Sequence, residues 1–580
     1  MSAAGVSRLL RAMAVLGAAG LSGAVEWWQI GPVYQIYPAS FADSDGDGIG
    51  DLNGIASHVD HFSKIGVEAV WMSPIFDSPM MDNGYDISNY MAINPMFGNL
   101  TDFQNLVSAL HNAGIKIMLD LVPNHSSNES QWFIDSVNQV NGKDDWYVWM
   151  NAKGYDSLDN PLPPNNWRSL FGGSAWTWNE VRKQFYLHQF GVFQPDLNYN
   201  NTDVVNQMKE VIKYWLGFGV DGFRVDAVPF IAETNYSFNE PIIEGCEPAD
   251  AYGCLDHIYT MDQDLTYEVL EQFAAVLQEQ NSNYSSSVKV QFVEAYTTVN
   301  ATMRYYTNHS SPFNFLMVTS VDRNTNATEL QNLTQSYLEA LPEGAWPNWV
   351  IGNHDNPRVG TRMGSDLIDA MNMLVLLLPG TPVTYNGEEI GMTDSFIRVD
   401  QYRDPNTPNR DPERTPMQWN ISLNAGFSTN VTDPYLPANP SYWQVNVASE
   451  TSTEPSHLSI YKQLVALNKE LAPSTSTNLT SAVLDDWVFA FLRDKYLIVV
   501  NLNDQVETFA LNALNFSIGD SVTVKIPSLN SLNFKVSDSI LTSSNITLYP
   551  RSGVVFSTMS SAAAVTAPIS LLLASVCLSL

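Results

Sequence analysis

Charged residues follow several apolar runs of this chain, at points where strands are expected to end. They are Asp120, Asn124 and His125 in DLVPNH, Arg224 and Asp226 in GFRVDA, Glu294 in FVEAY, and His354 and Asp355 in GNHD. A single charged residue of this kind usually has a structural role, in a strand-end cap or an ion pair. Four strand ends that bring together carboxylates, histidines and an arginine are harder to explain structurally, because burying charge is costly. We therefore expect a reactive site where these strands end.

A second group of acids lies in DSDGDGIGD, residues 43–51. Asp43, Asp45, Asp47 and Asp51 occupy positions 1, 3, 5 and 9 of this loop, and the backbone carbonyl of Ile49 occupies position 7. This is the oxygen-ligand spacing of a calcium loop. Position 12 is a glycine instead of a bidentate glutamate, which excludes a calcium-sensing EF-hand. The loop predicts a structural Ca²⁺, with Mg²⁺ as the alternative ion and a metal-free acidic turn as the alternative interpretation.

These side chains need a scaffold that brings distant strand ends together. Eight apolar runs are candidate strands, at residues 33–41, 67–76, 115–123, 220–228, 288–296, 313–321, 348–355 and 373–385. Residues 102–114 and 203–219 carry apolar residues at helical spacing and end in glycine, which indicates helices between strands. Eight alternating units predict a (β/α)8 barrel, whose active site lies at the carboxyl ends of its strands.

Two segments interrupt the alternation. Residues 126–193 are rich in Asn, Trp, Pro and Gly and are too long for a simple loop, so we expect a subdomain inserted after the third strand. From residue 478 to residue 558, short strand-like runs alternate with turns, which predicts a small antiparallel β-domain. The barrel would then comprise residues 24–125 and 194–477.

Both ends of the chain look like processing signals. Residues 1–23 combine two arginines, a short apolar run and small residues, which is typical of a secretory signal peptide, with an uncleaved anchor as the alternative. Residues 559–580 combine small residues, a spacer and a terminal apolar tail. This pattern predicts a glycosylphosphatidylinositol (GPI) anchor signal, with a membrane helix as the alternative. We expect a glycoprotein on the outer face of the plasma membrane.

The net charge limits the classes of partner, and the cysteine content limits the possible disulfides. A formal net charge of -33 argues against nucleic acid as a partner, because phosphates would be repelled. Of three cysteines, Cys577 lies in the tail that anchoring would remove. Cys246 and Cys254 remain, and an oxidising compartment would let them form a disulfide. Oligomeric state cannot be predicted from these features.

The ordered motifs DLVPNH, QPDLN, GFRVDA, FVEAY and GNHD resemble the signature regions of the α-amylase family of glycoside hydrolases. DGDGIGDLNGI, DNGYDIS and RTPMQW are similar to its oligo-1,6-glucosidase, maltase and sucrase branch. With the two terminal signals, the chain resembles the insect midgut maltases, including those of mosquitoes. The resemblance implies an oligosaccharide substrate, and a metal loop at residues 43–51.

The resemblance also implies roles for individual residues. Asp226 would be the nucleophile and Glu294 the acid/base, with Asp355 as the third carboxylate. A retaining glycosidase needs one ionised and one protonated carboxyl group. We expect the charge of Arg224 to keep Asp226 ionised, and an apolar or acidic surrounding to raise the pKa of Glu294.

The remaining implied residues bind substrate. His125 and His354 would contact sugar hydroxyls, Asp82 would grip the terminal hydroxyl, and Tyr85 would stack on the ring. Arg414 would pair with Asp82 and close the pocket, which implies an exo-acting enzyme.

The expected activity is that of a retaining α-glucosidase that acts on maltose-like substrates. Ala227 directly follows the nucleophile. By resemblance, a valine at this position marks α-1,6-specific enzymes, whereas a smaller residue goes with maltose-like substrates. The alternatives are a sucrose- or isomaltose-preferring hydrolase, a transglycosylase, and a non-catalytic surface receptor of the same fold. A role as a bacterial toxin receptor beside catalysis is implied by resemblance alone.

Overall fold

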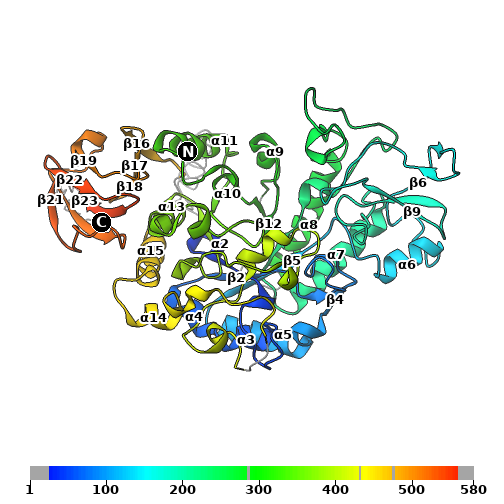
Figure 1. Ribbon diagram of the computed structural model, residues 1–580, viewed down its shortest axis with the longest axis horizontal. Coiled ribbons are helices and arrows are strands. Elements are labelled where there is room, and N and C mark those ends of the chain that lie inside the picture. Colours follow the sequence, from blue (N-terminus) through cyan, green and yellow to red (C-terminus); the bar gives the residue numbers. More distant parts are fainter. Residues whose placement is uncertain (1–24, 284–287, 308, 430–432, 473–476, 559–580) are drawn as a thin grey trace, which may run out of the picture.

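The computed structural model describes residues 25–558, apart from residues 284–287, 308, 430–432 and 473–476. The predicted signal peptide and the predicted anchor signal lie outside the described residues. In the part of the chain that is described, none of the helices has the length and apolar character needed to cross a bilayer. Figure 1 shows a broad central body of helices and strands, with β-rich parts at its two opposite ends.

A parallel eight-stranded sheet forms the centre of the molecule. In hydrogen-bonded order its strands are β13 (Ser310–Pro312), β12 (Val290–Val293), β11 (Gly222–Val225), β5 (Lys116–Leu121), β2 (Ala69–Met72), β1 (Val33–Ile36), β15 (Thr381–Tyr385) and β14 (Asn348–Val350). All neighbours in this order run parallel. Because the order follows the chain once around a circle, the sheet is a nearly closed (β/α)8 barrel, as predicted.

The barrel interior is filled with apolar side chains. Val33, Met118, Phe292 and Val350, each from a different strand, belong to one buried cluster inside the sheet. The outer faces of the strands pack against the surrounding helices in a second, larger cluster. With both faces covered, the strands need the nearly continuous apolar runs that the sequence contains.

Helices connect and cover the strands. They are α2 (Trp27–Ile30), α3 (Leu52–Ser57), α4 (Val59–Ile65), α5 (Leu100–Asn112), α7 (Thr202–Gly217), α8 (Asp264–Asn283), α9 (Val299–Arg304), α10 (Leu316–Ser320), α11 (Ala327–Ala340), α12 (Val359–Arg362), α13 (Ile368–Leu377), α14 (Val447–Ser452) and α15 (His457–Leu471). Side-chain caps mark where the two predicted helices begin. Asn99 accepts from the backbone of Thr101 and Asp102 at the start of α5, and Asn201 accepts from Asp203 at the start of α7.

Two predicted strands are wrong in extent. In the run 313–321, residues 316–320 form helix α10, and the strand β13 lies just before it. In the run 373–385, the apolar stretch 373–377 belongs to α13, and only residues 381–385 form a strand. All ten residues of α13 are buried. A helix buried on every side has no polar face, so its short apolar sequence cannot be distinguished from that of a buried strand.

Residues between β5 and α7 form a separate small unit at one end of the molecule (Figure 1). It contains α6 (Gln131–Asn138), a three-stranded antiparallel sheet of β6 (Trp149–Met150), β10 (Gln184–Leu187) and β9 (Trp176–Asn179), and the pair β7 (Gly154–Tyr155) and β8 (Pro161–Leu162). Its aromatic core includes Trp167, Trp176 and Phe185. A two-stranded ladder of β3 (Phe76–Asp77) and β4 (Asn89–Ile93) precedes α5.

Antiparallel strands form the opposite end of the molecule (Figure 1). Six of them pair in the order β16 (Thr480–Leu484), β17 (Val488–Arg493), β18 (Tyr496–Asn501), β23 (Gly553–Thr558), β20 (Ser521–Pro527) and β21 (Ser539–Leu541). A second ladder joins β19 (Glu507–Ala510) to β22 (Asn545–Leu548). Helix α13 contacts β23, so this C-terminal sheet rests directly on the barrel.

One side chain bridges the seam between the first and last strands of the sheet. The amide of Asn348, on β14, donates to the carbonyl of Pro312 at 2.7 Å and to the hydroxyl of Ser311 at 3.2 Å. Its oxygen accepts from the backbone N–H of Asn314 at 2.9 Å. Asn348 is fully buried, and the groups that it contacts, on β13 and directly after it, are buried with it and have no access to water.

We predict that Asn348→Ala lowers the melting temperature. The substitution leaves buried backbone groups of residues 312 and 314 without a partner, at a cost of about 1–3 kcal/mol for each. Thermal unfolding followed by circular dichroism measures the change. Asn138→Ala is the control, because Asn138 makes its hydrogen bond on the exposed end of α6 and its removal should change little. Equal melting temperatures for the two variants would contradict a structural role for the seam contact.

Candidate active site

The reactive side chains share a strand face with the apolar interior of the barrel. Met118 and Phe292 belong to the interior cluster, and Asp120 and Glu294 follow them by two positions. Side chains two positions apart on a strand point to the same side. The apolar layer therefore ends in a charged layer at the carboxyl ends of the strands, where barrels of this type carry their active sites.

A cavity of about 400 Å³ opens at this charged layer. Its volume lies within the range of small-ligand pockets, about 300–1,000 Å³. Six of the sequence-predicted residues line it: Asp82, Tyr85, His125, Asp226, Glu294 and Asp355. Arg224, His354 and Arg414 are almost completely buried and contact these residues from behind. All nine predicted catalytic and substrate-binding residues therefore meet at one site.

Arg224 is the centre of a buried ion-pair cluster. Its guanidinium lies 2.8 Å from Asp120, 2.5 Å from Asp226 and 2.8 Å from Glu294. Burial alone would lower the pKa of Arg224, but the surrounding carboxylates raise it well above its usual value. The guanidinium therefore stays charged and fixes the positions of the three acids.

Three carboxylates around one guanidinium leave excess negative charge in a buried space. Burial raises the pKa of Asp226 well above its usual range; Arg224 lowers it, and the neighbouring carboxylates raise it again. A hydrogen bond between the Asp226 and Glu294 carboxyl groups contributes to this increase. Arg224 thus lowers the pKa of Asp226 as expected, but burial and the neighbouring carboxylates raise it by more. Ionising both carboxyls at once is therefore costly, because like charges in contact repel each other in a buried space.

The backbone after Asp226 connects the two acids. Ala227 has φ 50° and ψ 37°, in the left-handed region that few residues other than glycine adopt. Its N–H donates to the Glu294 carboxylate at 2.9 Å. The N–H of Val228 donates to the Glu294 backbone carbonyl at 3.1 Å. This turn, which leads into the short helix η3 (Val228–Phe230), holds both carboxyls in fixed relative positions.

Tyr85 and His354 form a stacked pair under the cavity. Their rings lie 5.5 Å apart with planes at 8°, and the tyrosine hydroxyl contacts His354 Nε2 at 2.6 Å. The same hydroxyl donates to Asp120 at 3.1 Å, and Gln35 contacts the other histidine nitrogen at 2.7 Å. Burial lowers the pKa of His354 to about 3, so its imidazole is neutral near pH 7.

Gln194 links two predicted residues and was not itself predicted. It donates to Asp82 at 2.8 Å and contacts His125 Nε2 at 3.1 Å. Burial lowers the pKa of His125 to about 3, so this histidine is also neutral. The sequence did contain a signal, because Gln194 is the first residue of the QPDLN motif.

The predicted pairing of Arg414 with Asp82 is wrong. Arg410 contacts Asp82 at 3.1 Å, and it also contacts Asp355 at 3.0 Å and Asp404 at 2.6 Å. Arg414 lies 2.9 Å from Asp355 and 3.2 Å from Asp404. Both arginines belong to the 3₁₀ helix η8, residues 408–414, and lie four positions apart. The RTPMQW motif begins at Arg414, so it marked the right segment of the chain, but the arginine that contacts Asp82 lies four positions before it.

Asp355 is ionised in this arrangement. Burial alone would raise its pKa, but the guanidinium groups of Arg410 and Arg414, 3.0 and 2.9 Å away, hold the pKa well below its usual value. The cavity thus has one acid held in its charged form by two arginines, beside a pair of carboxyls that repel each other when both are ionised. Environments that differ in this way are how one site supplies both a charge and a proton donor.

The rest of the cavity wall is apolar, and the sequence did not predict it. It consists of Leu170, Phe171, Phe190, Pro229, Phe230, Tyr252, Met261 and Tyr296, besides Ala227. Tyr252 lies in the segment that the disulfide Cys246–Cys254 closes, which is the pairing indicated by the sequence. Isolated aromatics on long connections carry no pattern that separates them from core residues.

The acidic loop fits a hard cation in part. One carboxylate oxygen each from Asp43, Asp45 and Asp51 lies within 4.8 Å of the others, whereas Asp47 is not part of this group. Burial and the charges of the other three acids raise the pKa of Asp47, against a backbone hydrogen bond that lowers it. This repulsion is what a bound cation would relieve. Oxygen-only donors are the ligands that Ca²⁺ and Mg²⁺ prefer.

Part of this donor set already accepts hydrogen bonds from neighbouring residues. Asp43 accepts from the N–H groups of Gly46 and Gly48 at 2.6 and 2.9 Å. Asp51 accepts from Ser44 and caps α3 through the N–H of Gly54 at 2.7 Å. Carboxylates keep further lone pairs beside such bonds, so these contacts orient the acids and still permit metal binding.

Comparison with known proteins places the chain in a family. The α-amylase catalytic-domain model matches residues 35–475. Maltase A1 of Drosophila melanogaster is 42% identical over 86% of this chain and 91% of its own length, and the α-glucosidase of Apis mellifera is 40% identical over 83% and 86%. The crystal structure of the α-glucosyl transfer enzyme XgtA matches with a TM-score of 0.81, at 31% identity over 92% of this chain and 100% of that one. The chain belongs to the α-amylase family.

Proposed function

We propose that this chain is a retaining, exo-acting α-glucosidase that releases α-glucose from maltose and malto-oligosaccharides. The observation that carries the proposal is the pair of Asp226 and Glu294, which contact each other and one guanidinium in a cavity of small-ligand size. Carboxyl groups in direct contact match the short separation of retaining enzymes, about 5–5.5 Å, better than the 6.5–9.5 Å that inverting enzymes need for a water molecule.

The mechanism follows from the positions of these groups. Asp226 attacks the anomeric carbon while Glu294 gives its proton to the departing oxygen, and a glucosyl ester forms on Asp226. Water then loses a proton to Glu294 as it attacks the same carbon, which frees Asp226 and restores the α configuration. The N–H of Ala227 and the guanidinium of Arg224 orient Glu294 throughout.

Exo action follows from the contacts of Asp82 and Arg410. Their ion pair forms one part of the cavity wall, Gln194 supports Asp82 from behind, and both side chains of the ion pair can hydrogen-bond the terminal sugar hydroxyls. Asp355 and the neutral imidazole of His125 can supply further contacts to the same ring. One glucose unit therefore satisfies the polar groups at the closed end.

A second candidate activity is glucosyl transfer to a sugar. The α-glucosyl transfer enzyme XgtA shares this fold, and transfer to a sugar would proceed from the same glucosyl ester as hydrolysis. The small Ala227 side chain in the cavity favours maltose-type substrates over isomaltose, by the family resemblance. A purely non-catalytic receptor is disfavoured, because the acid pair, Arg224 and both histidines are all present and in contact. A toxin-receptor role stays a prediction.

We predict that Asp226→Asn and Glu294→Gln each remove almost all hydrolysis of p-nitrophenyl α-glucoside. Loss of either member of an acid pair costs several orders of magnitude in rate. The isosteric exposed changes Asp520→Asn and Glu339→Gln serve as controls and should keep wild-type rates. A rate within about tenfold of wild type in either active-site variant, equal to about 1.4 kcal/mol of barrier, would refute the assignment. Proton NMR should show α-glucose as the first product; initial β-glucose would exclude retention.

We further propose that the loop of residues 43–51 binds one structural Ca²⁺, with Mg²⁺ as the alternative. It would use carboxylate oxygens of Asp43, Asp45, Asp47 and Asp51 and the carbonyl of Ile49. The support is the convergence of three of these acids and the oxygen donor set. Both Gly46 and Gly48 have positive φ, 84° and 97°, so the loop depends on glycine for its tight turns.

Removal of the metal should lower the melting temperature. A ligand that binds only the folded state stabilises it by about 2.7 kcal/mol at one hundred times its dissociation constant. The measurement compares thermal unfolding with chelator and with added Ca²⁺, in wild type and in Asp45→Asn, with the exposed turn variant Asp159→Asn as control. Identical melting curves, together with no metal by elemental analysis, would leave the loop as a plain acidic turn.

We also propose that the mature protein is held on the outer face of the plasma membrane by a GPI anchor. The support is the composition of residues 1–23 and 559–580 and the disulfide between Cys246 and Cys254, which suits an oxidising compartment.

Phosphatidylinositol-specific phospholipase C should then release active enzyme from cells that express the full chain. A lipid anchor is cut by this treatment, whereas a membrane helix is not. Cells that express residues 1–558 provide the control and should secrete the enzyme without treatment. Retention on the membrane after treatment, with Cys577 still present in the mature protein, would contradict the proposal.

A further inference from the structure

Apart from Tyr296, the apolar part of the cavity wall comes from two long connections. One is the segment between β5 and α7, and the other is the segment of residues 226–263 between β11 and α8. Hydrogen bonds hold them together: Trp167 Nε1 donates to the carbonyl of Phe238 at 3.1 Å, and Arg168 pairs with Asp250 at 3.0 Å. The wall is thus one continuous surface built by both segments.

The lining residues form two groups, one charged or polar and one mostly aromatic, which would contact different sugar units of a bound substrate. Charged and polar side chains surround the point where Asp226 and Glu294 act, and these are the contacts that one glucose unit needs. A second sugar unit, on the leaving-group side, must then contact the remaining wall, which is mostly aromatic. Sugars bind such surfaces with their C–H faces against the rings and their hydroxyls on a few polar groups.

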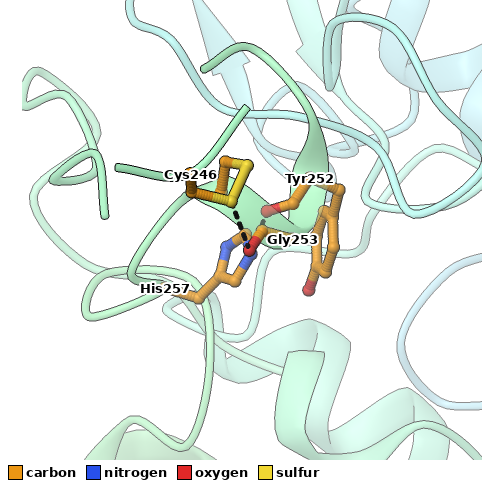
Figure 2. Close-up of a disulfide and its surroundings, with 5 residues drawn as sticks. Cys246, Tyr252, Gly253 and His257 are labelled. Carbon is orange, nitrogen blue, oxygen red and sulfur yellow. Dashed lines mark hydrogen bonds between the residues drawn. A yellow bond between two sulfur atoms is a disulfide. The ribbon is translucent and has the colours of Figure 1, made fainter. Parts of the chain in front are cut away.

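Tyr252 is the wall residue whose position is most strongly constrained. It starts the one-turn helix η4 (Tyr252–Cys254) inside the disulfide loop, next to the buried Cys254. Its ring stacks on His257 with centroids 4.0 Å apart, and His257 Nε2 lies 3.1 Å from the Tyr252 carbonyl (Figure 2). Figure 2 also shows Cys246 against the carbonyl of Gly253. The disulfide and the histidine therefore fix the ring at the cavity.

The hydroxyl of Tyr252 is free to bind a ligand. The hydroxyl lies 3.6 Å from the sulfur of Met261, and a thioether is a weak acceptor. Burial raises the pKa of the Tyr252 hydroxyl above its usual value, so the hydroxyl keeps its proton. Beyond Met261, Asp262 is anchored to Pro229 by a backbone hydrogen bond of 2.9 Å, which keeps this part of the wall next to the reactive turn.

We propose that the disulfide-closed segment of residues 246–254 supplies Tyr252 as the binding surface for the sugar unit on the leaving-group side of the scissile bond. The inference rests on the proposed α-glucosidase activity and adds the residue that recognises the second sugar. The ring packs against that sugar, and the phenol hydroxyl donates to one of its hydroxyls. In glucosyl transfer, the acceptor sugar would occupy the same surface.

The test compares a substrate that has a second sugar with one that does not. Maltose has a leaving glucose, whereas α-glucosyl fluoride leaves only fluoride. Tyr252→Ala should lower kcat/KM for maltose about tenfold and leave kcat/KM for α-glucosyl fluoride within about twofold. Tyr155→Ala, an exposed tyrosine of β7, is the matched control and should change neither value.

Two further variants keep the test decisive if Tyr252→Ala fails to fold. Tyr252→Phe preserves the ring and should lose a smaller part of the maltose rate, and Cys246→Ser/Cys254→Ser should reduce maltose turnover selectively by freeing the segment. Equal losses on both substrates, or no loss on maltose, would overturn the inference. Absence of activity on both substrates in the wild type would instead refute the proposed function.

Discussion

The site depends on one buried guanidinium surrounded by acids. Arg224 holds Asp120, Asp226 and Glu294 within hydrogen-bond distance, and its side chain is 2% exposed. A buried charge is tolerated only where it is paired and hydrogen-bonded. Because three carboxylates compete for one cation in a buried space, ionising all of them at once is costly. This imbalance favours the combination of one charged and one protonated carboxyl that a retaining glycosidase requires.

The barrel provides the rigidity that such a cluster needs. Asp120 and Arg224 lie on neighbouring strands in direct register, and Glu294 follows the next strand directly. The charged residues lie two positions beyond the apolar interior layer, so they rest on tightly packed side chains. Because this layer excludes water, the electrostatic contacts beside it are stronger. The seam contacts of Asn348 matter for the same reason, because they keep the strand circle closed at its only unpaired join among the described strands.

Most of the fold and the reactive centre could be predicted from sequence, for a physical reason. Asp226 and Glu294 directly follow apolar strands, and Asp355 lies in the turn after another, so local patterns mark them. Errors arose where local pattern is not decisive. The stretch 373–377 is apolar on all sides because α13 is buried all round, and nothing local separates that from a strand. The arginine that pairs with Asp82 depended on which of two neighbouring arginines reaches across the cavity, and only the fold determines that.

The apolar wall lay beyond sequence reasoning because long connections build it. Between η3 and α8 the described chain contains one turn of helix, η4, and several of its apolar residues face solvent, among them Phe238 and Ile242 at 57% exposure. Such a segment has little core to hold it. A disulfide that closes a short loop compensates by restricting the unfolded chain, typically by about 2–4 kcal/mol. Strands therefore fix the chemistry, while a cross-linked connection positions the surface that selects the second sugar, so selectivity can change without disturbing the acid pair.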